Sequence, residues 1–214
     1  RVYHDGFNKE GADLARAQVA AQRTFRWLEG LPPRVERLSM SGMQLGKDDM
    51  IVLAHFLKQH GKSITELDLK ANNLDYSCLE VLRGGLLSCP KLTGLALGDN
   101  PLWQGVTAAG GLGKVLCSII GSCAPKLEKL GLGNTGITDQ DSSVLAPVIQ
   151  RLRMLRVLGL SGNSISAQGL REIVQGLKLH NSGLTSLIVS KNPVQASEVE
   201  EMRQLVPNSL IIKF

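Results

Sequence analysis

Aromatic residues are scarce in this chain of 214 residues, where Phe, Trp and Tyr together make up 4%. Nucleic-acid-binding proteins usually interleave aromatic side chains with a concentrated basic stripe, whereas the net charge of +5 is dispersed along this sequence. The densest basic run contains Arg151, Arg153 and Arg156. It is consistent either with a solvated rim or with a contact for an acidic partner. We expect no nucleic-acid partner.

Long hydrophobic runs are also missing. No segment approaches the roughly 18 apolar residues that span a bilayer, and no basic-then-apolar leader opens the chain. The chain begins at Arg1, which we interpret as the start of a fragment or of a processed product. The four cysteines form no Cys-x-x-Cys pair, and no Asn-x-Ser/Thr acceptor occurs. These absences predict reduced thiols in an intracellular, cytoplasmic protein that does not contact a membrane.

Catalytic and ligand-binding signatures are absent too. The four histidines are scattered, and the acidic pairs Asp48-Asp49 and Glu200-Glu201 fall at expected helix starts, where they complement the helix dipole. The segment 110–114 resembles part of a phosphate-binding loop, but Ala108 and Val115 replace the required Gly and Ser/Thr. We therefore predict that the chain is not an enzyme and has no cofactor, metal or catalytic site.

The strongest pattern present is the stretch 155–165, Leu-Arg-Val-Leu-Gly-Leu-Ser-Gly-Asn-Ser-Ile. It reads LxxLxLxxNxI, the signature of a leucine-rich repeat. Leu158 and Leu160 alternate as in a strand that buries one face. The Asn163 amide can satisfy backbone groups in the following turn. Ser166 can cap an amphipathic helix whose apolar residues are Leu170, Ile173, Val174 and Leu177.

The same pattern recurs six times in register. Its first positions are Val35, Ile64, Leu92, Leu127, Leu155 and Leu184, so the steps are 29, 28, 35, 28 and 29 residues. Four units have Asn at the ninth position, and the other two have Met43 and Thr135. Leu210 and Ile212 supply a partial seventh unit. A period of 28–29 residues with a full helix resembles the ribonuclease-inhibitor type of leucine-rich repeat.

This resemblance implies an α/β leucine-rich repeat solenoid, a short horseshoe with a parallel concave sheet and convex helices. We expect residues 1–33 to form an N-terminal helical cap, with a helical pattern from Glu10 to about Leu28 ended by Gly30 and two prolines. Residues 34–206 would form six repeats, and residues 207–214 a final partial strand. Stacked units share one core, so we expect a single domain.

The outward side chains of the strands predict where a partner binds. Those of the first two units are charged, whereas Gly, Ala and Ser dominate the middle units and leave an open trough. The longest unit carries about six extra residues, within 101–105 or near 109–111, and insertions in solenoids often lie on the binding face. Trp103 is then either a binding anchor or packed within its own loop. The predicted protein-binding residues are Arg37, Glu66, Asp68, Lys70 and Trp103.

Repeats of this type are used mainly as binding platforms, so the resemblance implies a protein–protein interaction module. We expect a scaffold or recruitment domain of a larger intracellular protein or complex. One alternative is a regulator of a small GTPase or of the actin cytoskeleton, similar to the repeat domains of Ran GTPase-activating proteins and actin-capping regulators. Another is the ligand-sensing repeat domain of an innate-immune receptor, and a purely structural role in an assembly also stays open.

Overall fold

The computed structural model describes residues 5–108, 110–123, 126–179, 183–205 and 210–214. Within these ranges, parallel strands form one seven-stranded sheet in chain order. The strands are β1 (Arg37–Ser39), β2 (Glu66–Asp68), β3 (Gly94–Ala96), β4 (Lys129–Gly131), β5 (Val157–Gly159), β6 (Ser186–Ile188) and β7 (Ile211–Lys213). The central residue of each strand pairs with that of the next, from Leu38 beside Leu67 to Leu187 beside Ile212. The predicted α/β solenoid is therefore confirmed.

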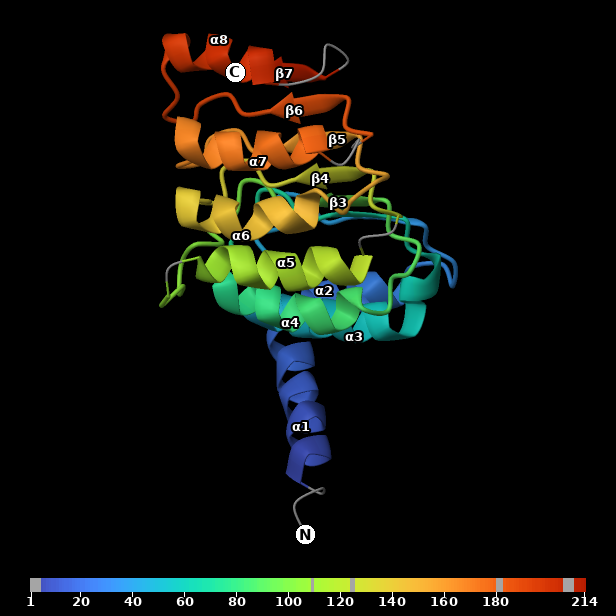
Figure 1. Ribbon diagram of the computed structural model, residues 1–214. Coiled ribbons are helices and arrows are strands. Elements are labelled where there is room, and N and C mark those ends of the chain that lie inside the picture. The colour runs from blue at the N-terminus through green and yellow to red at the C-terminus, as the bar shows by residue number, and fades with distance from the viewer. Residues whose placement is uncertain (1–4, 109, 124–125, 180–182, 206–209) are drawn as a thin grey trace.

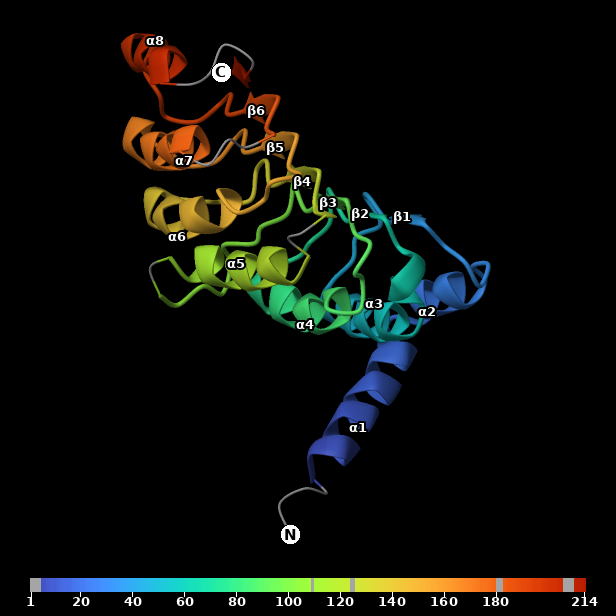
Figure 2. The ribbon, with the colours of Figure 1, turned by 45° about the vertical axis from the view of Figure 1, so that its right-hand side comes forward.

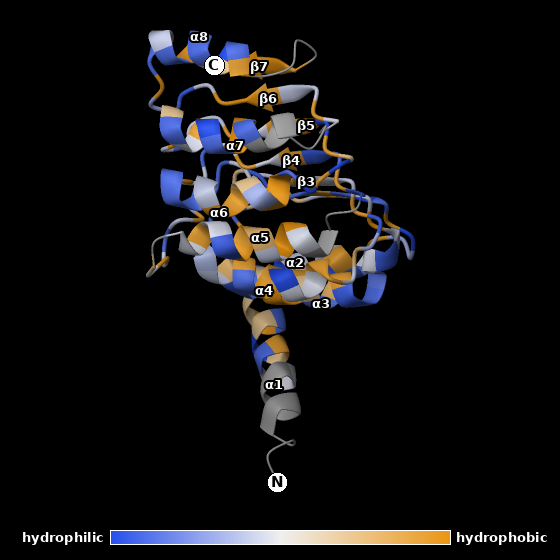
Figure 3. Ribbon diagram, viewed as in Figure 1, coloured by the Kyte–Doolittle hydropathy of each residue, from blue (hydrophilic) through white to orange (hydrophobic). Residues whose placement is uncertain are grey.

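A helix follows each of the first six strands and returns the chain to the start of the next strand. The helices are α3 (Lys47–His60, extended by the 3-10 turn Gly61–Ser63), α4 (Tyr76–Leu86), α5 (Gly111–Cys123), α6 (Asp139–Ile149), α7 (Ala167–Leu179) and α8 (Ala196–Leu205). They lie along one side of the sheet, so the repeats form a curved stack (Figures 1 and 2). The motif leucines lie between the two layers in one continuous core. Hydrophilic positions, blue in Figure 3, alternate with apolar ones around these helices.

The N-terminal region forms two helices, α1 (Asp5–Ala20) and α2 (Gln22–Glu29), separated at Ala21. The helical pattern predicted from Glu10 to about Leu28 is thus present, divided into two helices at Ala21. The α2 helix lies beside α3, where the buried Thr24 hydroxyl donates to Asp49 Oδ1 at 2.6 Å. Most of α1 projects away from the helical layer (Figures 1 and 2). The α3 helix is thus contacted by both α1 and α2.

Each repeat turn has the same backbone conformation directly before the Asn position. The residue there has a positive φ in all six units: Gly42 (68°), Ala71 (53°), Asp99 (57°), Asn134 (53°), Gly162 (66°) and Lys191 (59°). The two units without Asn also place the residue after that position in the left-handed region, at Gln44 (φ 59°) and Gly136 (φ 78°). Loss of the Asn therefore accompanies a different turn.

The buried Asn side chains join neighbouring repeats. Asn100 Oδ1 accepts hydrogen bonds from the backbone N–H groups of Asn72 and Leu74, at 3.0 and 3.2 Å. Its Nδ2 donates to the carbonyls of Leu69, Leu97 and Gly98. Asn72 and Asn163 bond in the same way. This confirms the predicted role of the Asn163 amide, and these bonds fix the distance between adjacent turns.

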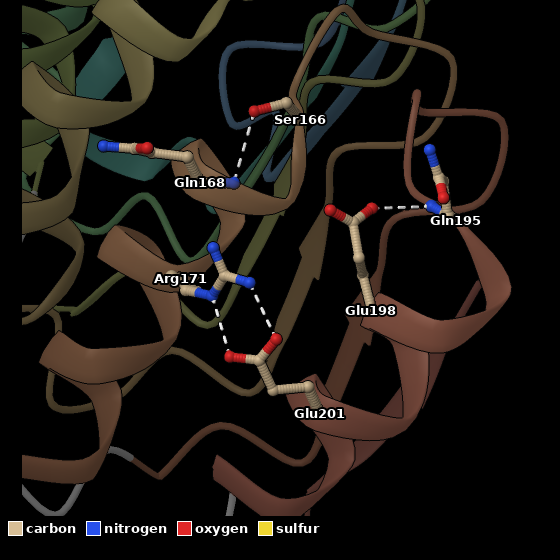
Figure 4. Close-up of polar contacts among 6 residues, drawn as sticks. All are labelled: Ser166, Gln168, Arg171, Gln195, Glu198 and Glu201. Atoms are coloured by element: carbon tan, nitrogen blue, oxygen red, sulfur yellow. Dashed lines mark hydrogen bonds and ion pairs between the residues drawn. The ribbon is translucent and has the colours of Figure 1, made fainter.

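Two acidic pairs were predicted to lie at helix starts, and the structure places only the first of them there. Asp49 lies in the first turn of α3 and accepts from the Gly46 N–H at 2.9 Å. Glu201 lies inside α8, so the prediction that Glu200-Glu201 begins a helix is wrong. Its carboxylate instead forms a two-pronged ion pair with the Arg171 guanidinium of α7, at 3.0 and 2.7 Å (Figure 4). This pair links the last two helices of the stack.

Candidate functional site: the open face of the sheet

The helices cover only one face of the sheet. In β1 the Leu38 side chain points inward and is 2% exposed, while Arg37 and Ser39 on either side of it are exposed. The same alternation, a buried centre between more exposed neighbours, holds in β2, β4, β5 and β6. Parallel sheets are normally buried on both faces. No helix in the described part of the chain covers the concave face of this sheet, so its backbone and side chains are available to another molecule.

Three charged residues form a row across the first four strands. Glu66 Oε2 lies 3.4 Å from Arg37 Nε on β1, and Glu66 Oε1 lies 3.7 Å from Lys129 Nζ on β4. Gly94 of β3 stands between Glu66 and Lys129 in the register. A Cβ atom at Gly94 would be 3.2 Å from Glu66 Cγ, so the glycine gives the glutamate room to lie across β3.

The structure therefore joins two of the predicted residues, Arg37 and Glu66, and adds a third that the prediction missed. Lys129 follows the unit with the 35-residue step, so it is distant in sequence, and only the strand register places it beside Glu66. A sequence signal for this contact does exist. At the motif position shared by Glu66, Gly94 and Lys129, the small glycine separates two residues of opposite charge. These exposed pairs orient the side chains but contribute little to stability.

Asp68 and Lys70, also predicted as binding residues, follow Glu66 along the second unit. Asp68 is partly exposed, and its Oδ1 accepts from the Lys70 backbone N–H at 3.1 Å. This bond holds the carboxylate beside the end of β2, between Ser39 of β1 and Ala96 of β3 in the register. The Lys70 side chain is exposed at the same end. The concave face of the first two units thus presents both signs of charge.

Trp103 lies apart from this row, in the connection between β3 and α5 and within 101–105, the first place predicted for the extra residues. Of the second place, near 109–111, residue 109 lies outside the described residues and Gly111 begins α5. The Gln104 carbonyl accepts from the Tyr76 N–H at 3.0 Å, which ties the connection to the start of α4. On the other side the indole covers Gly136, where a Cβ atom would be 2.2 Å from Trp103 Cδ1. The ring is nevertheless 55% exposed. It therefore packs on the next repeat and also presents an aromatic face to solvent.

The middle of the concave face is bare, as the sequence predicted. A Cβ atom at Gly131 would meet Ala96 at 3.7 Å, and one at Gly159 would meet Gly131 at 3.8 Å, both ordinary contact distances. Strand packing therefore does not require glycine at either place. Glycine there keeps the surface low, so that the backbone of a partner can approach these strands closely.

A separate hollow of about 340 Å³ lies between the N-terminal helices and α3. Leu14, Phe25 and Pro33 line it together with Phe56 and His60, whose rings stack with centroids 4.6 Å apart. Its lining includes none of the predicted binding residues. Within the described residues, no group of three or more His, Cys, Asp or Glu side chains could hold a metal ion.

The described cysteines are reduced thiols. Cys78 and Cys89 are buried and Cys117 is partly buried. Burial raises the pKa of the Cys78 and Cys117 thiols to about 11, so little thiolate forms near neutral pH. The Cys123 side chain lies outside the described part. Among the described helices, none combines the length and apolar character needed to cross a membrane.

Known proteins share the repeat pattern of this chain. The leucine rich repeat family matches residues 151–174. The chain is 31% identical over 142 residues to NACHT, LRR and PYD domains-containing protein 5 of Bos taurus, covering 66% of this chain and 12% of that protein. It is 27% identical over 175 residues to the ribonuclease inhibitor of Sus scrofa, covering 82% of this chain and 37% of that protein.

A solved structure shows the same fold at low sequence identity. A protein of Bacteroides fragilis superposes with a TM-score of 0.53 at 16% identity, over 71% of this chain and 41% of that one. The curated relatives are much longer than the region they share with this chain, which spans between 12% and 37% of those named above. The similarity therefore concerns only a part of each of these relatives.

Proposed function

Because the chain belongs to the leucine-rich repeat proteins of the ribonuclease-inhibitor type, we propose that it is a scaffold or recruitment module that binds a protein partner on its concave face. The uncovered face of the parallel sheet carries this proposal. On this face the side chains of the strands are exposed to solvent, whereas most folds with a parallel sheet bury them under a second layer of helices. In a solenoid this face is the extended surface used for binding.

The proposed contact region is the N-terminal half of the concave face and its neighbouring loop. It consists of Arg37, Glu66, Asp68, Lys70 and Trp103, with Lys129 added from the structure. Arg and Trp are common among the residues that dominate binding energy at interfaces. The charged row gives the surface a pattern that a partner can match, and the glycine floor beside it lets that partner approach the sheet closely.

The proposed setting is a larger intracellular protein or complex, with residues 1–33 as the cap, 34–206 as the repeats and 207–214 as the last partial strand. The role is binding rather than catalysis. A ligand-sensing role is a second candidate, because several curated relatives are NACHT, LRR and PYD domains-containing proteins. That candidate requires a nucleotide-binding domain in the same full-length protein, which the complete coding sequence would reveal.

The test compares two variants with the same change in charge. The concave variant is Glu66→Lys/Asp68→Lys, and the matched control is Glu80→Lys/Glu200→Lys on exposed helical positions. Each is used to capture proteins from cell extract, with quantification by mass spectrometry. A partner recovered by the parent and the control but lost by the concave variant is the expected result. A partner recovered equally by all three would show that the concave N-terminal half is not the binding surface.

A further inference from the structure

The connections that lead from each helix into the next strand lie along one edge of the solenoid, at the right of Figure 1. Five of these connections place a cation one or two residues before the first motif position. The five cations, all exposed, are Arg34, Lys62, Lys91, Lys126 and Arg153. Because successive repeats stack, residues that are about 30 apart in the sequence form a column at this edge.

Arg151 and Arg156 add two more exposed cations to the same edge. Among the described residues of the helix-to-strand connections, Glu36 and Glu128 are the only acidic ones. These described residues therefore carry an excess of five positive charges, equal to the net charge of the whole chain. The strand-to-helix connections on the opposite edge are electrically balanced. The charge that is dispersed in the sequence is therefore gathered on one side by the fold.

The fold itself accounts for only part of this column. Cations near helix C-termini complement the helix dipole, yet three arginines follow α6, where one would suffice. Among the described residues, none of the seven cations forms an ion pair with a carboxylate, in contrast to Arg37 and Arg171. Charges of one sign gathered on one edge create a positive potential along it, which an anionic partner would neutralise.

The geometry points to an extended acidic polypeptide segment as the occupant of this basic rim, defined as the seven cations named above. From β1 to β5 the rim covers four strand steps, about 19 Å. A segment of about six extended residues spans that length at roughly 3.3 Å per residue. Leu87 and Met154, 65% and 44% exposed, lie in the same connections and offer apolar contacts beside the charges.

Nucleic acid and anionic lipid are the competing sources of negative charge. Single-stranded nucleic acids are usually bound with aromatic side chains that stack on the bases, and the described helix-to-strand connections contain none. Membrane-surface binding usually adds a broad apolar face to the cations, whereas the rim offers two separated apolar side chains. These differences favour a polypeptide. The inference does not depend on the proposed concave-face function.

The test measures binding of a fluorescent polyglutamate peptide of about eight residues by anisotropy at low salt. The rim variant is Lys91→Gln/Lys126→Gln/Arg153→Gln. The matched control, Lys47→Gln/Lys114→Gln/Arg203→Gln, removes the same charge from exposed positions elsewhere. Loss of three exposed ion pairs is expected to weaken peptide binding about 5- to 30-fold in the rim variant, while the control stays within about twofold of the parent.

Equal binding by the parent and the rim variant, or equal weakening in both variants, would overturn the proposal. Vesicles of phosphatidylserine and phosphatidylcholine and a single-stranded oligonucleotide complete the comparison. If either is bound more tightly than the peptide, and the rim variant loses that binding, the rim recognises a different partner and the proposal is wrong. The Glu66→Lys/Asp68→Lys variant is expected to retain peptide binding, which separates this test from that of the concave face.

Discussion

Replacing Asn100 with Ala should destabilise the repeat stack more than any exposed substitution. The side chain is 1% exposed and makes five hydrogen bonds to the backbone of its own turn and of the preceding one. Two of the acceptors keep another donor after the change, because Asn72 Nδ2 also donates to the Leu69 carbonyl and the Ala71 N–H also donates to the Gly98 carbonyl.

The remaining three groups lose the partner that the side chain supplied: the N–H groups of Asn72 and Leu74 and the carbonyl of Leu97. A buried backbone group left without a partner costs about 1–3 kcal/mol. The expected loss from the three groups is therefore about 3–9 kcal/mol, a large part of the roughly 5–15 kcal/mol of stability typical of a domain.

Urea unfolding followed by circular dichroism measures this loss. The neighbouring Asn73 is exposed, so Asn73→Ala is the matched control and is expected to change the free energy of unfolding by less than about 0.5 kcal/mol. Asn192→Ala is expected to fall between the two, because that residue is only partly buried and makes three side-chain bonds. A loss below about 1 kcal/mol for Asn100→Ala would refute the idea that these amides hold the turns together.

Three further perturbations test other features. Gly136→Ala should lower stability by at least about 1 kcal/mol, because φ is +78° there and the new Cβ meets Trp103; an unchanged melting temperature and tryptophan emission would contradict this. The ion pair with Arg171 lowers the pKa of Glu201 below its usual value. The stability that this ion pair contributes is therefore fully present at a pH above the usual pKa, and it is lost as the pH falls through the pKa of the folded state. The difference in urea midpoint between parent and Arg171→Met should therefore be larger at pH 7 than in acid, where Glu201 is protonated, and a difference that does not change with pH would refute the assignment. Because its pKa is raised to about 11, the Cys117 thiol should be about one-thousandth thiolate at pH 8. It should therefore react slowly with iodoacetamide until the protein unfolds. Equal alkylation rates in folded and unfolded protein, measured by mass spectrometry, would contradict this.

The repeat architecture could be predicted from the sequence because each strand pair, such as Leu158 and Leu160, recurs at a fixed interval. Every predicted pair contributes a buried residue to the sheet layer, and the connection from β3 to α5 is longer than those of the neighbouring units. These features depend on local periodicity alone. Burial of one strand face and one helix face dictates the same arrangement in each unit.

Features that depend on contacts between units could not be predicted in the same way. Lys129 meets Glu66 because the register places both beside Gly94, and no spacing rule gives that across a 35-residue step. The basic rim was visible only in part as the run containing Arg151, because its other members are separated by whole repeats.

The central claim is that a partner contacts the open face of the sheet, and site-specific photo-crosslinking tests it most directly. A photoreactive amino acid placed at Ser39, exposed on β1, probes the concave face, and one at Gln175, exposed on α7, probes the helical side. We expect Ser39 to crosslink the partner recovered from extract and Gln175 to give no such product. Crosslinking from Gln175 but not from Ser39 would contradict the proposed binding surface.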